Sequence, residues 1–184
     1  MIEVRIHGRG GQGAVIAGKL LACALFKEGQ WVQSFPAFGV ERRGAPVAAF
    51  TRFDRDQIFI RNNIYEPDHV VVLDPTLIGV ADVTAGLRPG GWVVINSSAP
   101  PESFDKLAGF RVATVDATAI ALDNRLGSRS APIVNTAILG AFARATGLVD
   151  LESVLAAIAD EVPVKPDENA AAARTAFTAT RLPD

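Results

Sequence analysis

Residues 2–13 read Ile-Glu-Val-Arg-Ile-His-Gly-Arg-Gly-Gly-Gln-Gly, and this stretch decides the fold. Apolar residues alternate at positions 2, 4 and 6, which predicts a strand, and the glycines that follow fit the pattern G-x-G-x-x-G. In residues 13–27, small and apolar side chains recur at intervals of three and four, which predicts an amphipathic helix. A strand, a glycine-rich turn and a helix in this order are typical of a Rossmann-like phosphate-binding turn.

Each glycine of this turn has its own expected role. Gly8 permits a tight turn, Gly10 lets a ligand approach the backbone, and Gly13 lets the helix sit close to the strand. Free N–H groups at the start of the helix favour a phosphate or a carboxylate. A tight strand-to-helix turn that binds nothing explains the same glycines equally well. The candidate binding residues of the turn are Gly8, Gly10, Gly11, Gln12 and Gly13.

The second predicted strand, residues 31–35, lacks a part that a dinucleotide site needs. An acidic residue normally ends this strand and holds the ribose of NAD. Here the strand is followed by Pro36, and neither an acid nor an arginine stands at that place. The sequence therefore argues against a free-standing NAD(P)-dependent dehydrogenase of the Rossmann type.

The remaining pattern predicts an α/β fold in one domain. Residues 47–53 and 57–60 are predicted to form a hairpin around the turn at 54–56, and short β-branched runs predict further buried strands. The buried strands are expected at residues 69–73, 92–95 and 110–115. Helices are expected at residues 117–125, 132–146, 151–160 and 167–180. We expect a Rossmann-like three-layer sandwich with a mainly parallel sheet, a β-hairpin insertion and C-terminal helices.

Composition excludes several classes of protein. The chain has 184 residues, one cysteine and two histidines, so it can supply neither a disulfide nor a four-cysteine metal site by itself. Its net charge of -2 gives no sign of a nucleic-acid partner. No apolar run reaches the roughly 18–20 residues of a membrane span, and the N-terminus does not resemble a signal peptide. A cytoplasmic protein with no membrane contact is expected.

A second loop, residues 34–45, combines two aromatic residues with three charges. Glu41, Arg42 and Arg43 stand together in it. Adjacent arginines suit an anionic ligand or carboxylates on another subunit. A surface loop in which Glu41 pairs locally with an arginine is the simpler alternative.

Taken together, these motifs resemble the gamma subunit of the 2-oxoacid:ferredoxin oxidoreductases, and the likeness extends over nearly the whole chain. The residues that carry the resemblance are Gly8, Gly10, Gly11, Gln12, Gly13, Pro36, Gly39, Glu41, Arg43, Gly44, Pro67, Asp68, Leu73 and Asp74, with the run Asn-Thr-Ala-Ile-Leu-Gly at 135–140. Ala45 departs from the pattern, because the family often has a second glycine there. This departure bears on the backbone path of the loop.

The resemblance implies a reaction in which a 2-oxo acid and coenzyme A give an acyl-CoA, carbon dioxide and reduced ferredoxin or NADH. It implies that no cofactor is bound by this chain alone. Thiamine diphosphate with Mg²⁺, [4Fe–4S] clusters and, in NAD-linked members, FAD or NAD would belong to other subunits. The implied partners are an alpha subunit, a thiamine-binding beta subunit and a ferredoxin-like delta subunit. Residues 163–184 are expected to form an arm that contacts a partner subunit.

The resemblance also suggests a role for the two loops. Residues 8–13, or the loop with Glu41, Arg42 and Arg43, are expected to hold the phosphates of coenzyme A, and no catalytic or metal-binding residue is expected. The alternative is that both loops serve only subunit packing. For the chain as a whole, a non-catalytic nucleotide-binding or scaffold module is a further alternative. The 14 arginines against 4 lysines suggest a GC-rich bacterial gene. NAD-linked members that resemble phenylglyoxylate dehydrogenase are therefore included among the candidates.

Overall fold

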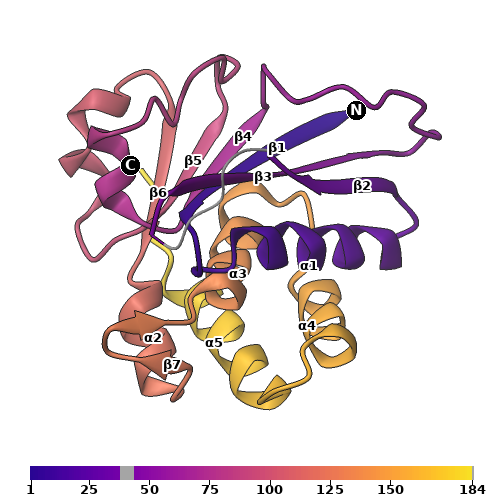
Figure 1. The fold of residues 1–184 in the computed structure, drawn as a ribbon. Coiled ribbons are helices and arrows are strands. Elements are labelled where there is room, and N and C mark those ends of the chain that lie inside the picture. The colour runs from indigo at the N-terminus through magenta and orange to yellow at the C-terminus, as the bar shows by residue number, and fades with distance from the viewer. Residues whose placement is uncertain (38–43, 184) are drawn as a thin grey trace.

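The structure, a computed structural model, describes residues 1–37 and 44–183. Within these residues, a six-stranded sheet with the order β2-β3-β1-β4-β5-β6 forms the centre of the molecule (Figure 1). Its strands are β1 (Ile2–Arg9), β2 (Trp31–Pro36), β3 (Pro46–Asp54), β4 (His69–Val72), β5 (Trp92–Asn96) and β6 (Arg111–Val115). β3 is antiparallel to both of its neighbours, whereas β1, β4, β5 and β6 pair in parallel. The prediction of a mainly parallel α/β sheet is confirmed.

One face of the sheet is covered by α-helices, as Figure 1 shows. The helices are α1 (Ala14–Lys27), α2 (Ala117–Asp123), α3 (Asn135–Thr146), α4 (Leu151–Glu161) and α5 (Pro166–Ala179). α3 lies in the middle of this layer, and most of its side chains are buried. A Cβ atom added at Gly140 would lie 2.0 Å from the carbonyl oxygen of Ala173, so α3 and α5 pack closely because this position is glycine.

The opposite face is covered by short 3-10 turns and loops. The turns are η1 (Pro75–Gly79), η2 (Pro101–Ser103) and η3 (Asp105–Leu107). A separate apolar cluster forms here, in which Leu77, Val83, Leu87 and Leu107 pack with buried residues of β4, β5 and β6. The three layers are therefore helices, sheet and turns.

The predicted hairpin has a different partner strand. Residues 57–60 are not a strand, and β3 instead pairs with β1 on one edge and with β2 on the other. Because both edges of β3 are occupied, no backbone groups remain to pair with residues 57–60. The antiparallel insertion is the pair of β2 and β3. A small second hairpin, β7 (Gly127–Ser128) with β8 (Ala131–Pro132), was not predicted.

A buried arginine explains how the segment after β3 is held. Arg52 is 0% exposed and forms an ion pair of 3.1 Å with Glu3. Its guanidinium also donates to the carbonyl oxygens of Ile60 and Asn62, at 3.4 and 2.7 Å. A buried charge needs such partners, and here they fix an irregular segment on the sheet face that α1 leaves uncovered.

The C-terminal segment packs within its own domain. α5 lies against α3 and buries Ala172, Ala173 and Ala176. Residues 163–183, the described part of the expected arm, therefore do not stand away from the domain in this structure. Their expected contact with a partner subunit stays a prediction.

Candidate functional site

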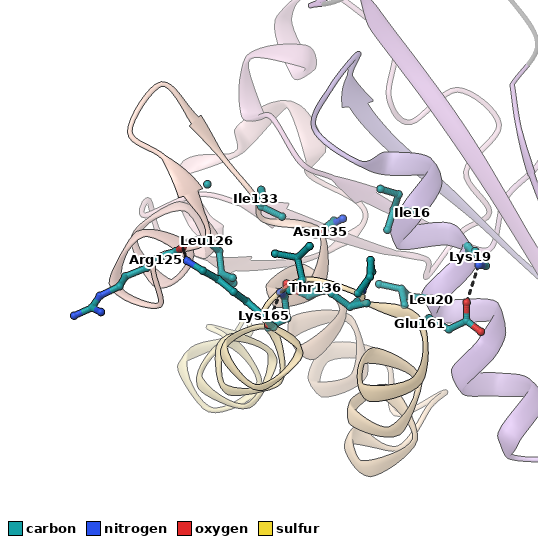
Figure 2. A pocket seen from close by; sticks show the side chains of 15 residues that line it. Ile16, Lys19, Leu20, Arg125, Leu126, Ile133, Asn135, Thr136, Glu161 and Lys165 are labelled. Carbon is teal, nitrogen blue, oxygen red and sulfur yellow. Dashed lines mark hydrogen bonds and ion pairs between the residues drawn. The ribbon is translucent and has the colours of Figure 1, made fainter.

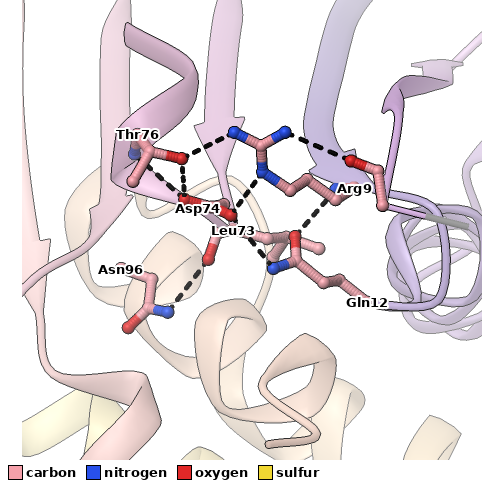
Figure 3. A network of polar contacts seen from close by, with 7 residues as sticks. Arg9, Gln12, Leu73, Asp74, Thr76 and Asn96 are labelled. Atoms are coloured by element: carbon pink, nitrogen blue, oxygen red, sulfur yellow. Dashed lines mark hydrogen bonds and ion pairs between the residues drawn. The ribbon is translucent and has the colours of Figure 1, made fainter. Parts of the chain in front are cut away.

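Three parallel strands end at the same edge of the sheet, and polar residues gather there (Figure 3). Arg9 ends β1, Asp74 follows β4, and Asn96 ends β5. Ligands of open α/β sheets bind beyond the carboxyl ends of the strands. The glycine turn opens at this edge as well, so we take the edge as the candidate site.

The central contact of the site joins Arg9 to Asp74. Arg9 Nε donates to Asp74 Oδ2 at 2.8 Å, and the two side chains are 29% and 16% exposed. The remaining nitrogens of the guanidinium donate to Thr76 Oγ1 at 2.8 Å and to the carbonyl oxygen of Gly44 at 3.1 Å. Arg9 thus ties together the glycine turn, the end of β4 and the end of the second loop. It was missed in the sequence, although its place at the end of a strand beside a glycine was a signal.

Gln12 completes this network from inside the glycine turn. Its Oε1 accepts from the N–H of Arg9 at 2.7 Å, and its Nε2 donates to Asp74 Oδ2 at 3.3 Å. Burial alone would raise the pKa of Asp74, but hydrogen bonds from Thr76, Arg9 and Gln12 outweigh it and lower that pKa. Asp74 is therefore ionised. Its side chain caps η1 by accepting from Thr76 N–H, and it also orients the glycine turn through Gln12.

The turn itself is made by Gly11 and Gly13, whose φ angles are +97° and +80°. Gly8 was expected to make it, and that expectation is wrong, because Gly8 lies within β1 and pairs with Val47. A Cβ atom at Gly8 would lie 3.2 Å from Leu73 Cδ1 and 3.3 Å from Ala14 Cβ. Because it has no side chain, Gly8 allows β1 to pack closely against the side chains of Leu73 and Ala14.

The role expected for Gly13 is also corrected. A Cβ atom at Gly13 would lie 2.7 Å from Asn135 Nδ2, so this glycine makes room for the start of α3. The close approach of α1 to the sheet occurs one turn later, at Gly18. A Cβ atom there would lie 3.1 Å from Ser34 Oγ and 3.2 Å from Thr51 Oγ1.

Backbone hydrogen bonds fasten the second loop to the glycine turn. Gly10 N–H donates to the carbonyl oxygen of Ala45 at 2.9 Å, and Gly44 N–H donates to that of Gly10 at 3.0 Å. The backbone of Gly10 is therefore engaged with this loop. Glu41, Arg42 and Arg43 lie outside the described residues, but the loop that contains them ends beside the glycine turn.

The start of α1 has the electrostatic character of an anion site. Within the described residues, Gly13 supplies no side-chain cap and the first turn of α1 contains no acidic residue. The unpaired N–H groups and the dipole of a helix favour a negative charge at such an end. No side chain of α1 itself satisfies that preference.

The ribose site of a dinucleotide enzyme is missing for two reasons. No acid follows β2, as the sequence showed. In addition, the sheet order places β3 between β1 and β2, so β2 is not adjacent to the strand that leads into the glycine turn. The geometry therefore supports the prediction against a Rossmann dehydrogenase.

Two other polar residues near this edge serve the fold. Asn96 Nδ2 donates to the carbonyl oxygen of Leu73 at 2.9 Å, and its Oδ1 accepts from Thr118 N–H at 3.1 Å. His7 Nε2 accepts from Arg5 Nε at 3.0 Å. Burial and the nearby Arg5 charge lower the pKa of His7 to about 4, so its imidazole is neutral near pH 7.

Metal and thiol chemistry find no support in the part of the chain that the structure describes. No cluster of three or more His, Cys, Asp or Glu side chains there could hold a metal ion. Burial raises the pKa of the Cys23 thiol, which therefore stays protonated. Among the described helices, none is long and apolar enough to cross a membrane.

The family model described as "Pyruvate ferredoxin/flavodoxin oxidoreductase" matches residues 3–179 of the chain. Among individual relatives, the "Pyruvate/ketoisovalerate oxidoreductases common subunit gamma" of Thermococcus kodakarensis is 57% identical over 185 residues. That alignment covers 98% of this chain and 97% of the relative.

Solved structures show the same fold. Pyruvate oxidoreductase subunit PORC from Thermotoga maritima superposes with a TM-score of 0.84 at 35% identity, covering 100% of this chain and 98% of the other. A 2-oxoglutarate:ferredoxin oxidoreductase from Magnetococcus marinus, solved with 2-oxoglutarate, coenzyme A and succinyl-CoA bound, superposes with a TM-score of 0.70. At 19% identity it covers 96% of this chain and 30% of the other, and it shows the fold alone.

Proposed function

This chain belongs to the pyruvate ferredoxin/flavodoxin oxidoreductase family, and from that membership we propose its part in the reaction. It is the gamma subunit of a 2-oxoacid:ferredoxin oxidoreductase complex, and so it works together with other subunits. We propose that the complex converts a 2-oxo acid and coenzyme A to an acyl-CoA and carbon dioxide. The electrons pass to ferredoxin, or to NAD in a complex with a flavin subunit. The Thermococcus relative, at 57% identity, is named as a subunit of pyruvate/ketoisovalerate oxidoreductases, and this supports an oxo acid as the substrate.

The amino-acid sequence of this chain bears on which subunits of the proposed complex hold the cofactors. Its single cysteine cannot supply the four thiolates of an iron–sulfur cluster. We therefore assign the clusters to a ferredoxin-like delta subunit, and thiamine diphosphate with Mg²⁺ to the beta subunit, with an alpha subunit as the remaining partner. Thiamine would supply the carbanion chemistry when bound there. A cytoplasmic location accords with these partners.

For this subunit we propose a role in binding coenzyme A. The observation that carries the proposal is that the uncapped start of α1 and the end of the second loop are joined by the Gly10 hydrogen bonds and by Arg9. A helix start suits a phosphate, and Arg42 and Arg43 suit a diphosphate or a 3′-phosphate. The coenzyme-binding residues would be Gly8, Gly10, Gly11, Gln12, Gly13, Glu41, Arg42 and Arg43. Gly10, Gly11, Gln12 and Gly13 would shape the turn, Gly8 would let it pack closely against the sheet, and the arginines would contact the anion.

The test is steady-state kinetics of the reconstituted complex with Arg43→Ala or Gly10→Ala in this chain. We expect the KM for coenzyme A to rise about tenfold, since a charge-assisted contact contributes roughly 1.5–3 kcal/mol. Decarboxylation measured without coenzyme A should not change. Arg55→Ala is the matched control, because Arg55 is exposed beyond the opposite end of β3.

The alternative is that both loops only pack against other subunits. It predicts weaker assembly with an unchanged KM for coenzyme A. An unchanged KM in an intact complex would therefore remove the coenzyme role and leave the chain as a scaffold module.

A further inference from the structure

A cavity of about 460 Å³ lies between α1, the start of α5 and the β7–β8 hairpin, and it reaches Asn135, which packs beside Gly13 of the glycine turn (Figure 2). We call it the α1–α5 pocket. Its lining is mostly apolar and includes Leu20, Leu126, Val162 and Pro163. The volume falls in the range of pockets that bind ligands. None of the functions described above uses it.

The rim of the pocket exposes large apolar side chains. Ile16, Ile133 and Val164 are 54%, 45% and 68% exposed, and they come from three separate segments. Monomeric proteins seldom leave contiguous apolar patches open to water, and such patches mark interaction sites. The exposed apolar rim therefore marks the α1–α5 pocket as a candidate interaction site.

The charges around the pocket are positive. Three cations and one acid line it, and the acid, Glu161, pairs with Lys19 at 2.7 Å. Among the described residues, Arg125 and Lys165 make no ion pair. Figure 2 shows the Arg125 side chain extending outward from the pocket. Arg129 is exposed between β7 and β8, in the hairpin whose Gly127 lines the pocket, and it adds a further cation to that hairpin.

Two backbone positions at the mouth are strained. Arg125 and Lys165 have φ angles of +57° and +53°, and they are the non-glycine residues with positive φ in the described part of the chain. Lys165 Nζ donates to the carbonyl oxygen of Arg125 at 2.6 Å, so a hydrogen bond links the two strained residues directly. Strain of this kind persists where surrounding structure enforces it, and it gathers at functional sites.

The pocket also contacts a polar group that lacks a partner. Asn135 is 5% exposed, and its Oδ1 accepts no hydrogen bond from the described residues. Neighbouring Thr136 Oγ1, by contrast, donates to Asn169 Oδ1 at 2.8 Å. A buried acceptor left unpaired is uncommon, because it costs roughly 1–3 kcal/mol.

We propose that the α1–α5 pocket docks a segment of another subunit of the complex. The segment places an apolar side chain between Ile16 and Ile133 and carries carboxylates that pair with Arg125, Arg129 and Lys165. Charge complementarity favours this occupant, since Arg125 and Lys165 line the pocket and make no ion pair among residues 1–37 and 44–183. The proposal rests on membership in a multi-subunit complex and does not depend on the coenzyme role.

The experiment measures assembly of the purified chain with the thiamine-binding subunits. Ile133→Asp places a charge on the apolar rim, and Arg129→Glu reverses a charge at the hairpin. Both side chains are exposed, so the fold should tolerate the changes. Tyr65→Asp and Arg55→Glu are matched controls, because they alter an exposed aromatic and an exposed arginine away from the pocket.

We expect Ile133→Asp and Arg129→Glu each to weaken binding at least tenfold, and binding of the wild type to weaken as salt is raised. The controls should bind like the wild type. Thermal melting of each isolated variant checks its fold, and Val164→Asp replaces Ile133→Asp if the latter melts early.

Wild-type affinity in the pocket variants would overturn the proposal, as would an equal loss in the controls. Self-association of the isolated chain that Ile133→Asp abolishes, with subunit binding unchanged, would assign the pocket to a second copy and would also overturn it. The KM for coenzyme A in complexes that still form tests the coenzyme role separately.

Discussion

Arg9 and Asp74 are 65 positions apart in the sequence, yet Arg9 Nε lies 2.8 Å from Asp74 Oδ2. This contact joins the ends of two adjacent parallel strands, β1 and β4. Through Gly44, the same guanidinium also reaches the second loop. The geometry of the candidate site therefore depends on an ion pair between strands as well as on its glycines.

Asp74→Asn should weaken this junction. The variant keeps the shape of the side chain but loses the charge that accepts from Arg9, Gln12 and Thr76, so the free energy of unfolding should fall by about 1–2 kcal/mol. Urea unfolding at pH 7 measures the change. Asp123→Asn, at an exposed carboxylate, should have little effect.

The contribution of the Asp74 carboxylate to stability should depend on pH. The pKa of Asp74 is lowered in the folded chain. Its contribution to the free energy of unfolding is therefore complete above pH 3.8, the ordinary pKa, and is lost as the pH falls below that value. The difference in stability between wild type and Asp74→Asn should therefore shrink below pH 4. A difference that stayed constant down to pH 2 would contradict the assignment.

His7 should make the chain less stable between pH 6.5 and pH 4. Its pKa is about 4 in the folded state and near 6.5 when unfolded, so only the unfolded chain takes up a proton in this range. The free energy of unfolding should fall by up to about 3 kcal/mol from this group as the pH drops. His7→Gln should remove that part of the pH dependence, and equal slopes for both proteins would refute the claim.

Gly13→Ala should destabilise the chain more than Gly29→Ala does. Both glycines have φ near +80°, but a Cβ atom at Gly29 meets nothing within 4 Å, whereas one at Gly13 lies 2.7 Å from Asn135 Nδ2. Gly29→Ala therefore reports the backbone strain alone, about 1 kcal/mol, and Gly13→Ala adds the displacement of Asn135. Equal losses of stability in chemical unfolding would mean that α3 adjusts freely to the extra methyl group.

Local patterns in the sequence predicted the elements that form through local contacts. The alternation at residues 2–6 and the glycines that follow correspond to β1 and the start of α1. The runs at 69–73 and 92–95 correspond to β4 and β5. The missing acid after residues 31–35 counted against a free-standing dehydrogenase, and the family match agrees with that interpretation.

Contacts between distant segments were not predictable in the same way. Residues 57–60 have the composition of a strand, but β3 already has a partner on each side, and only the sheet order reveals this. Arg52 sits at a buried strand position where an apolar residue is the usual choice, because Glu3 and two carbonyl groups satisfy its charge. Arg9 likewise gained its role from Asp74 and Gly44, which lie far away in the sequence.

The binding of coenzyme A at the start of α1 is the central claim, and a charge placed in the first turn of that helix tests it most directly. Val15 is 41% exposed there, and an acid at this place complements the helix dipole, so Val15→Asp should fold normally. Calorimetric titration of the assembled complex with coenzyme A should show at least tenfold weaker binding for Val15→Asp. Val15→Asn, of the same size but uncharged, should bind within about twofold of the wild type. Wild-type affinity in Val15→Asp would contradict the claim.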